Sequence, residues 1–279
     1  MIAGTRRALR WAQRFAAGRP AGATVLAYHL VGGGTASRVD IGAEVLRAQL
    51  ASTRGIAEAV PLGELADRLR AGGDGAAFVV TFDDGYRNFA ERAWPVLRAA
   101  EVPATLFVPV GFVEGECPPP LSGAELPALS WAQLRELARD PLVEIGSHSW
   151  THPDLRRCSD AALERELGGS RQRLEERLDV PVRSFCYPRG VWDRRVEAAV
   201  AREYDLAVAG GGRRVTPRGF RRTRVWRTSV TRELGDDLQP VLGARVWLEE
   251  LLADLWRHHG RRRRREAGDD VAPGPGTGA

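Results

Sequence analysis

Short apolar runs alternate with amphipathic helical patterns along most of this 279-residue chain. The apolar runs have the length and the β-branched or aromatic content of buried strands, and they lie at 24–30, 77–84, 104–110, 142–148, 183–188, 205–210 and 224–230. The helical patterns lie at roughly 44–54, 62–71, 87–100, 130–139, 159–178, 192–203 and 244–258. Because strand–helix alternation produces mostly parallel sheets, the pattern predicts an α/β domain, built as a barrel or as a doubly wound sheet.

Unusual side chains stand where the predicted strands end. In both architectures functional groups gather at the carboxyl ends of the strands. Clusters of this kind occur at the ends of the first, second, fourth and fifth predicted strands: His29, Asp83 with Asp84, His148, and Tyr187 with Pro188. Structural residues would coincide with these positions only by chance, so we expect them to form one site.

The segments "TFDDG" and "SHSWTH" predict a metal centre. His148 and His152 are four residues apart, so a turn can aim both imidazoles at one point. Two histidines and one carboxylate form a three-ligand face that suits zinc and leaves positions open. One of the two aspartates can bind the cation, while the other takes a proton from water, and the cation offsets the repulsion between the carboxylates.

Simpler interpretations exist for each segment alone. A pair of histidines four apart is more often structural than metal-binding. The Asp-Asp-Gly sequence is also compatible with a turn and with the N-cap of the helix predicted at 87–100. A cap explains only one of the two aspartates, and it does not explain the buried strand before them.

Together, "TFDDG", "SHSWTHPDL" and "FCYPRG" resemble the polysaccharide deacetylase family, also called the NodB-homology domain or carbohydrate esterase family four. The resemblance runs from about Thr24 to about Val230. It implies a single-domain distorted (β/α) barrel of about seven parallel strands, with a divalent metal, most often Zn²⁺. It also implies that Asp83 is the general base and that Asp84, His148 and His152 hold the metal.

The third segment departs from the commonest family pattern. Many members carry a base-orienting arginine where this chain has Cys186, and "FCYPRG" looks like the branch that acts on bacterial exopolysaccharides. Arg183, Arg189 and Arg227 remain open as the residue that orients Asp83. We interpret Cys186 as a small packing residue and not as a nucleophile.

Two further catalytic roles follow from the resemblance. The late histidine of most members is missing, and His29 takes its place as the general acid in the exopolysaccharide branch; a core histidine is the simpler alternative. The backbone N–H of Tyr187 is expected to stabilise the oxyanion. Pro188, Trp150 and Arg189 are expected to contact the sugar.

The predicted activity is hydrolysis of the acetamido group of an N-acetylated sugar, oligosaccharide or lipid-linked glycan precursor, releasing acetate. Two alternatives remain. One is hydrolysis of a non-sugar C–N bond, such as a cyclic imide or amide, at the same kind of site. The other is a catalytically dead carbohydrate-binding homologue, which the missing arginine and late histidine favour.

Charge and cysteine content suggest the remaining expectations. We expect a basic N-terminal extension at 1–22, the deacetylase domain at 23–240, a C-terminal helix at 241–260, and a basic then disordered tail at 261–279. The three cysteines form no CxxC pair, and no signal-peptide h-region is apparent, which predicts a cytoplasmic protein. The arginine-rich ends allow weak contact with an anionic membrane, and nucleic-acid binding is not expected.

Overall fold

A computed structural model describes residues 22–71, 76–121, 123, 125–212 and 214–242. Its centre is a sheet of parallel strands in the order β1-β10-β9-β8-β7-β6-β5-β4. The strands are β1 (Gly22–Tyr28), β4 (Ala57–Ala59), β5 (Ala76–Phe82), β6 (Ala104–Val108), β7 (Val143–Ser147), β8 (Ser184–Cys186), β9 (Leu206–Gly210) and β10 (Val225–Ser229).

The sheet closes into a seven-stranded barrel because β1 pairs on both of its edges. It pairs with β10 on one side and with the whole length of β5 on the other, from Gly22 opposite Ala76 to Tyr28 opposite Phe82. The short strand β4 pairs with the start of β5, and β6 pairs with its end. The prediction of a single-domain (β/α) barrel of about seven parallel strands is confirmed.

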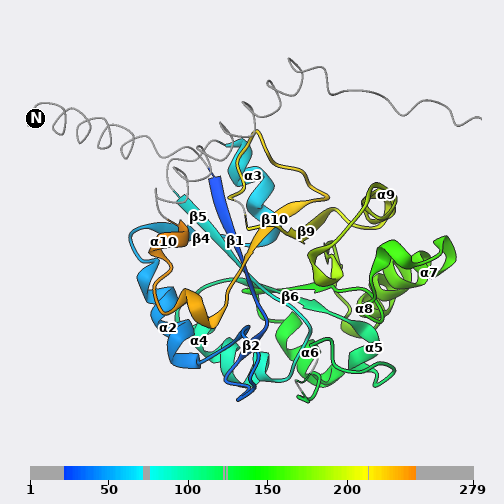
Figure 1. The fold of residues 1–279 in the computed structure, drawn as a ribbon, viewed down its shortest axis with the longest axis horizontal. Coiled ribbons are helices and arrows are strands. Elements are labelled where there is room, and N and C mark those ends of the chain that lie inside the picture. Colours follow the sequence, from blue (N-terminus) through cyan, green and yellow to red (C-terminus); the bar gives the residue numbers. More distant parts are fainter. Residues whose placement is uncertain (1–21, 72–75, 122, 124, 213, 243–279) are drawn as a thin grey trace, which may run out of the picture.

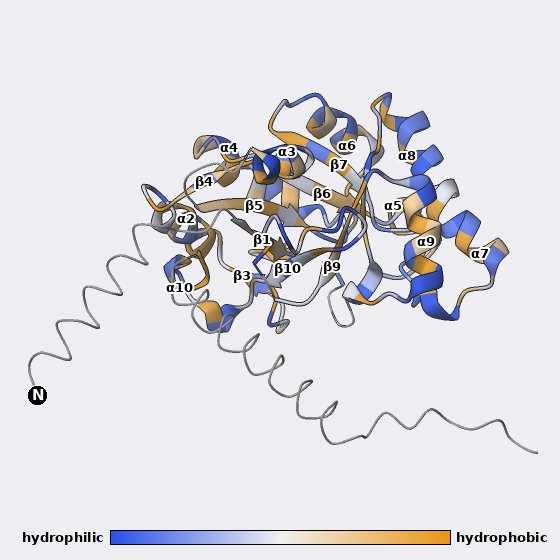
Figure 2. Ribbon diagram, turned by 90° about the horizontal axis from the view of Figure 1, so that it is seen from above, coloured by the Kyte–Doolittle hydropathy of each residue, from blue (hydrophilic) through white to orange (hydrophobic). Residues whose placement is uncertain are grey.

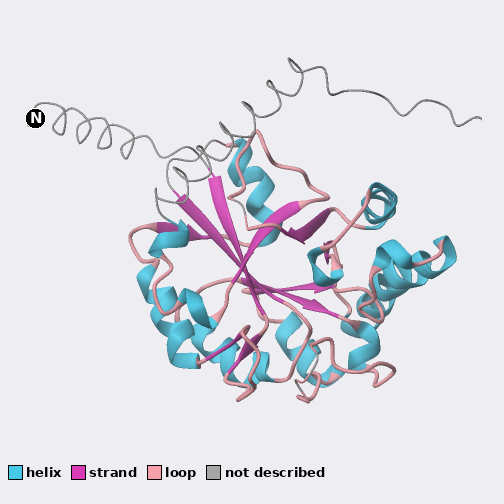
Figure 3. Cartoon of the chain, viewed as in Figure 1, coloured by secondary structure: helices cyan, strands magenta, loops and turns pink. Residues whose placement is uncertain are grey.

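Helices surround the strands, as Figures 1 and 3 show. They are α2 (Ala43–Ser52), α3 (Leu65–Arg70), α4 (Trp94–Ala99), α5 (Val110–Val113), α6 (Trp131–Ala138), α7 (Asp160–Glu164), α8 (Ser170–Leu178), α9 (Arg194–Glu203) and α10 (Gln239–Leu242). A separate two-stranded ladder joins β2 (Leu30–Val31) to β3 (Asp40–Ile41). In Figure 2 the central strands β5 and β6 are largely orange, whereas the outer helices α7, α8 and α9 contain many blue residues.

Strand alternation divides the side chains between two apolar clusters. On β5, Phe78, Val80 and Phe82 pack in the layer between the sheet and the helices, whereas Ala77 and Val79 belong to the barrel interior. Cys186 on β8 belongs to the same interior cluster. Continuing the alternation of β5 by two steps from Thr81 brings Asp83 to the interior face at the carboxyl end of the barrel.

Several predicted elements differ from the structure at their ends. The first predicted strand, 24–30, stops at Tyr28, so His29 lies between β1 and β2. The helix predicted at 159–178 is two helices joined by a π-helical turn, Arg165–Gly169, although its predicted N-cap is present because Ser159 accepts from the Ala162 N–H. The helix predicted at 244–258 and both terminal segments fall outside the described residues. No helix within the described part of the chain has the length and apolarity to span a membrane.

Candidate active site

Asp83 is held by a buried arginine. The Arg227 Nη1 and Nη2 atoms each donate to one oxygen of Asp83, both at 2.7 Å, and the two side chains are only 5% and 4% exposed. Burial by itself raises the pKa of Asp83, but the charge and hydrogen bonds of Arg227 outweigh it and hold that pKa well below its usual range. Asp83 is therefore a fixed, ionised carboxylate.

The sequence left three arginines open as the partner of Asp83, and in the structure that partner is Arg227. It reaches Asp83 from β10 across the barrel interior, and its Nη1 also donates to Thr81 Oγ1 at 3.0 Å. Arg183 and Arg189 are both exposed. The sequence signal for this role was the position of Arg227 in the predicted strand 224–230. It comes two residues after Val225, which faces the barrel interior, so strand alternation directs a charged side chain to the interior as well.

Asp84, His148 and His152 converge as predicted. Asp84 Oδ1 lies 3.5 Å from His148 Nε2 and 3.7 Å from His152 Nε2, and one ligand atom from each residue lies within 4.8 Å of the others. The rings of the two histidines are 4.6 Å apart. His148 Nδ1 is hydrogen-bonded to the Cys186 carbonyl at 2.8 Å, which directs its Nε2 toward Asp84.

The backbone around these ligands is unusual. Asp84 has φ 73° and His152 has φ 57°, in the left-handed region that non-glycine residues seldom adopt. Gly85, at φ 64°, follows Asp84 and packs against Val108. Conformations of this kind cost about 1–3 kcal/mol each and persist at functional sites where the surrounding structure imposes them.

The three ligands fit a divalent cation. Asp84 is 2% exposed, yet its Oδ2 has no hydrogen-bond partner within the part of the chain that the structure describes. Burial and the charge of Asp83 raise the pKa of Asp84 well above its usual value, which is the expected behaviour of a buried carboxylate that lacks a counter-ion. Burial lowers the pKa of His148 to about 4 and that of His152 to about 3, so both imidazoles are neutral and able to ligate at pH 7.

His29 reaches the same site from the end of β1. Its Nε2 lies 3.7 Å from Asp83 Oδ2, and its side chain is 19% exposed, so it borders both Asp83 and solvent. Burial lowers the pKa of His29, with the charge of Asp83 opposing that shift and the charge of Arg227 adding to it. His29 is therefore mainly neutral at pH 7 before substrate binds. Its Nδ1 has no hydrogen-bond partner among the described residues.

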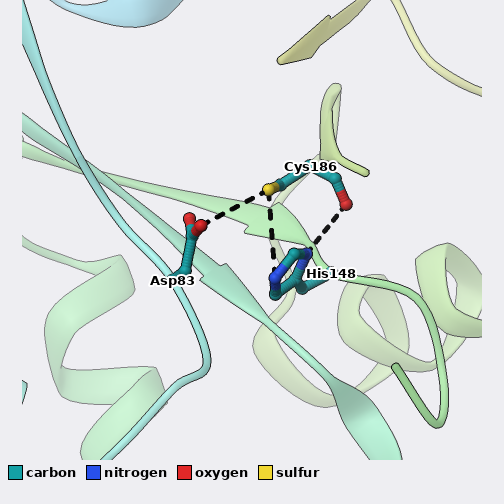
Figure 4. Close-up of side chains that lie close together, drawn as sticks. All are labelled: Asp83, His148 and Cys186. Atoms are coloured by element: carbon teal, nitrogen blue, oxygen red, sulfur yellow. Dashed lines mark hydrogen bonds between the residues drawn. The ribbon is translucent and has the colours of Figure 1, made fainter. Parts of the chain in front are cut away.

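Cys186 lies close to both Asp83 and His148, as Figure 4 shows. Its Sγ is 3.6 Å from Asp83 Oδ2, 3.9 Å from His148 Nε2, and 2.9 Å from Arg227 Nη2, which donates to it. The residue is fully buried, and burial raises the pKa of its thiol well above the ordinary value. A buried, protonated thiol is a poor nucleophile, in agreement with its interpretation as a packing residue.

The expected role of Tyr187 needs correction. Its backbone N–H already donates to the Val208 carbonyl at 3.1 Å, as part of the pairing between β8 and β9, and so cannot also serve an oxyanion in this conformation. Its hydroxyl donates to the Thr223 carbonyl at 2.9 Å. Tyr187 therefore fixes the strand end from which the site is built.

Two of the three expected sugar contacts are also structural. Trp150 is 8% exposed, its indole N–H donates to Glu116 at 2.8 Å, and the Arg165 guanidinium lies over its ring at 5.1 Å. Pro188 is buried at the start of a 3₁₀ turn, Pro188–Gly190. Neither presents a free surface to a sugar. Arg189, in the same turn, is exposed.

The end of the proline-rich segment, at 125–129, lies beside the two aspartates. The Leu129 N–H donates to the Gly85 carbonyl at 2.9 Å, and the Arg87 N–H donates to the Pro127 carbonyl at 2.9 Å. These bonds hold the end of the segment against the turn that follows Asp84, at the carboxyl end of the barrel.

Comparison with known proteins agrees with this geometry. The family model described as polysaccharide deacetylase matches residues 71–209, which include the base and all three predicted ligands. The chain belongs to the polysaccharide deacetylase family. It is 42% identical over 80 residues to a poly-beta-1,6-N-acetyl-D-glucosamine N-deacetylase of Escherichia coli; the match covers 26% of this chain but only 12% of that enzyme.

Solved structures share the fold. The structure of IcaB from Ammonifex degensii is 26% identical, with a TM-score of 0.63, and the match covers 77% of this deacetylase-family chain and 94% of that one. The Streptococcus pyogenes deacetylase PplD, in complex with acetate, has a TM-score of 0.69 at 20% identity, over 80% of this chain and 99% of that one. The second likeness supports the barrel alone.

Proposed function

We propose that this protein is a metal-dependent deacetylase that hydrolyses the acetamido group of an N-acetylated sugar. The observation that carries the proposal is the arrangement of the two adjacent aspartates. Arg227 donates to both oxygens of Asp83, which serves as the general base, whereas Asp84 lies beside His148 and His152. A structural turn would not need two buried carboxylates with separate partner sets.

Asp84, His148 and His152 would hold the cation. Two imidazoles and a carboxylate suit Zn²⁺, and such an ion supplies Lewis acidity toward the acetamide carbonyl and lowers the pKa of water from 15.7 to about 7. The protein's own part is to keep the three ligands neutral or anionic, to orient His148 through the Cys186 carbonyl, and to keep Asp83 separate from Asp84.

The proton path runs from Asp83 to His29. Asp83 removes a proton from the attacking water. Because an imidazole holds a proton more tightly than a carboxylate with a depressed pKa, that proton passes to His29, whose Nε2 is 3.7 Å away. His29 then protonates the departing nitrogen, without which an amine leaves poorly. Acetate and a free amino sugar result.

The backbone just after β8 also offers a donor for the oxyanion. With the Tyr187 N–H engaged by Val208, and with no N–H on Pro188, the next backbone donor is that of Arg189, which stands at φ 59°. A single donor of this kind is worth roughly 2.7–4 kcal/mol in other hydrolases. We propose Arg189, in place of Tyr187, for this role.

Oligomers of N-acetylglucosamine are the first substrates to test. The E. coli relative is named for poly-beta-1,6-N-acetyl-D-glucosamine, and a lipid-linked glycan precursor is the further candidate. Wild-type protein loaded with Zn²⁺ should release acetate from β-1,6-linked oligomers. Asp83→Asn should lower the rate at least about a hundredfold, consistent with loss of a general base. Asp67→Asn, at a 75% exposed carboxylate paired with Arg70, is the matched control.

The competing functions give different results. Release of acetate from no acetylated sugar, with turnover of a cyclic imide, would move the activity to a non-sugar C–N bond. Purified protein that contains no metal and turns over neither substrate would favour a catalytically dead carbohydrate-binding homologue, which has no need to retain the ion. Cytoplasmic location and weak membrane contact also remain proposals. Unchanged co-sedimentation with anionic liposomes after deletion of 258–279 would exclude a membrane role for that tail.

A further inference from the structure

The loop that carries the predicted ligand His152 has a strained backbone. Residues 149–152 follow β7, and we call them the ligand loop. Ser149 at φ 67° and His152 at φ 57° both stand in the left-handed region, where non-glycine residues are strained. The loop therefore needs support from outside to keep His152 Nε2 near Asp84 Oδ1, 3.7 Å away.

One buried side chain binds the N–H groups in the middle of the ligand loop. Glu166 Oε2 accepts hydrogen bonds from the Trp150 N–H at 2.9 Å and from the Thr151 N–H at 2.8 Å. Its Oε1 accepts from the Thr151 hydroxyl at 2.7 Å, and the residue is only 7% exposed. Because both N–H groups lie between the two left-handed residues, Glu166 holds the strained part of the loop directly.

The carbonyl groups of the ligand loop are bonded to a different element. At the start of α5, the Val110 N–H donates to the Ser149 carbonyl at 3.2 Å, and the Gly111 N–H donates to the Trp150 carbonyl at 2.7 Å. A β-carbon at Gly111 would lie 2.9 Å from that Trp150 oxygen, so only glycine allows this close approach. The loop is thus fixed on one side by backbone bonds and on the other by the side chain of Glu166.

Glu166 lies in the π-helical turn Arg165–Gly169, between α7 and α8. Turns of this kind are short interruptions of a helix and occur frequently at functional sites. Two buried hydroxyls stabilise this one: Ser170 donates to the Glu166 carbonyl at 2.7 Å, and Tyr204 donates to the Leu167 carbonyl at 2.7 Å. These bonds fix the backbone from which Glu166 reaches the ligand loop.

We propose that Glu166 is a positioning residue of the metal centre, which fixes the ligand loop so that His152 meets the other two predicted ligands. It acts through the backbone of Trp150 and Thr151 and is not itself a ligand. The inference rests on the metal site of the proposed function and adds to it a residue outside the ligand set. Loss of a group that orients a metal ligand typically lowers metal affinity or activity about 10–100-fold.

Two substitutions at Glu166 separate its hydrogen bonds from its charge. Glu166→Ala removes all three acceptor contacts. Glu166→Gln keeps them, because the amide oxygen can accept from both N–H groups while the amide NH₂ donates to the Thr151 hydroxyl. We expect the Ala variant to bind Zn²⁺ at least about tenfold more weakly than wild type, and the Gln variant to bind it as tightly as wild type.

Two measurements on the full-length protein test this expectation. Competition with a chromophoric chelator gives the affinity for Zn²⁺. The visible absorption spectrum of the Co²⁺-loaded protein reports the geometry of the ligands around the ion. Glu166→Ala should change that spectrum, and Glu166→Gln should give the wild-type spectrum.

Glu175→Ala is the matched control. Glu175 Oε1 also accepts from a backbone N–H, that of Val182 at 3.0 Å, and from Arg171 Nε at 3.1 Å, so its loss removes comparable bonds elsewhere in the protein. Both Ala variants should lower the melting temperature of the metal-free protein. Only Glu166→Ala should change the Zn²⁺ affinity and the Co²⁺ spectrum.

The possible failures can be told apart. If Glu166→Ala does not fold, Glu166→Asp takes its place, because the shorter side chain withdraws the carboxylate from the loop and should weaken metal binding in the same way. Wild-type Zn²⁺ affinity and Co²⁺ spectrum in a folded Ala or Asp variant would overturn the role of Glu166 alone. A Gln variant as weak as the Ala variant would also overturn it, because hydrogen bonds would then not be what fixes the loop.

The metal site itself is tested by the wild type. Wild-type protein that binds neither Zn²⁺ nor Co²⁺ would overturn the metal site of the proposed function, and the role of Glu166 with it.

Discussion

At the scale of single residues, Asp84 is strongly constrained. It combines a left-handed φ of 73°, 2% exposure and a side-chain oxygen that has no hydrogen-bond partner among the described residues. A buried carboxylate in this state destabilises the metal-free protein, and only a cation would convert it into a favourable ligand. The same side chain therefore destabilises the metal-free protein and provides a ligand for the cation.

Asp84→Asn should therefore have opposite effects with and without metal. Removing the uncompensated charge should stabilise the metal-free protein by on the order of 2 kcal/mol. The rise in melting temperature that Zn²⁺ gives the wild type should disappear in the variant. Calorimetric melting with Zn²⁺ and with EDTA measures both effects, and Asp67→Asn, 75% exposed, is the control. An equal Zn²⁺-induced rise in variant and wild type would remove Asp84 from the ligand set.

At the scale of elements, the arginine that we propose to orient the base comes from a different strand in this chain. Many relatives are expected to carry it at the end of the strand that corresponds to β8, where Cys186 stands here. Arg227 instead enters from β10, with β9 lying between the two strands. Both side chains point into the barrel and meet at Asp83, so the interior can receive the guanidinium from either strand.

Moving the arginine from position 227 to position 186 tests whether either strand can supply the partner of Asp83. Arg227→Ala leaves Asp83 buried and unpaired and should lower kcat about a hundredfold, with a loss of stability of about 3–5 kcal/mol. Adding Cys186→Arg to that variant should recover at least about tenfold of the lost rate by restoring the ion pair. Arg222→Ala, at a 61% exposed arginine, is the control. A double variant no faster than Arg227→Ala would show that only β10 can supply the arginine.

At the scale of the whole molecule, the barrel also encloses a carboxylate at the end opposite the proposed active site. Glu144 lies near the amino end of β7, where it accepts hydrogen bonds from Ser184 Oγ at 2.6 Å and Thr105 Oγ1 at 3.4 Å. Burial raises its pKa, although these hydrogen bonds and one from the Gly63 backbone oppose that shift. The folded state thus holds the proton more tightly than the unfolded state does.

Glu144 should therefore reduce stability at neutral pH. Below the ordinary glutamate pKa of about 4.3 the residue is protonated in both states and has no such effect; as the pH rises above that value, the unfolded state ionises first and gains stability. Glu144→Gln should raise the melting temperature by about 2 °C at pH 7, with the difference shrinking toward pH 4. Exposed Glu136→Gln serves as the control. A Gln variant equally destabilised at both pH values would show that hydrogen bonding to the carboxylate outweighs its burial.

The sequence pattern predicted the seven barrel strands and the convergence of Asp84, His148 and His152, while the choice of a barrel over a doubly wound sheet came from the family resemblance. These follow from local information: apolar runs define parallel strands, and parallel strands bring their carboxyl ends to one face. Only the tertiary structure decided which arginine reaches Asp83, that the Tyr187 N–H is already bonded, and that Trp150 is buried. The partner of Asp83 depends on which side chains from non-adjacent strands meet inside the closed barrel, and strand periodicity gives the facing of a residue but not its partner across the interior. The Tyr187 bond depends on how β8 pairs with β9, and the burial of Trp150 depends on the segments that pack around it.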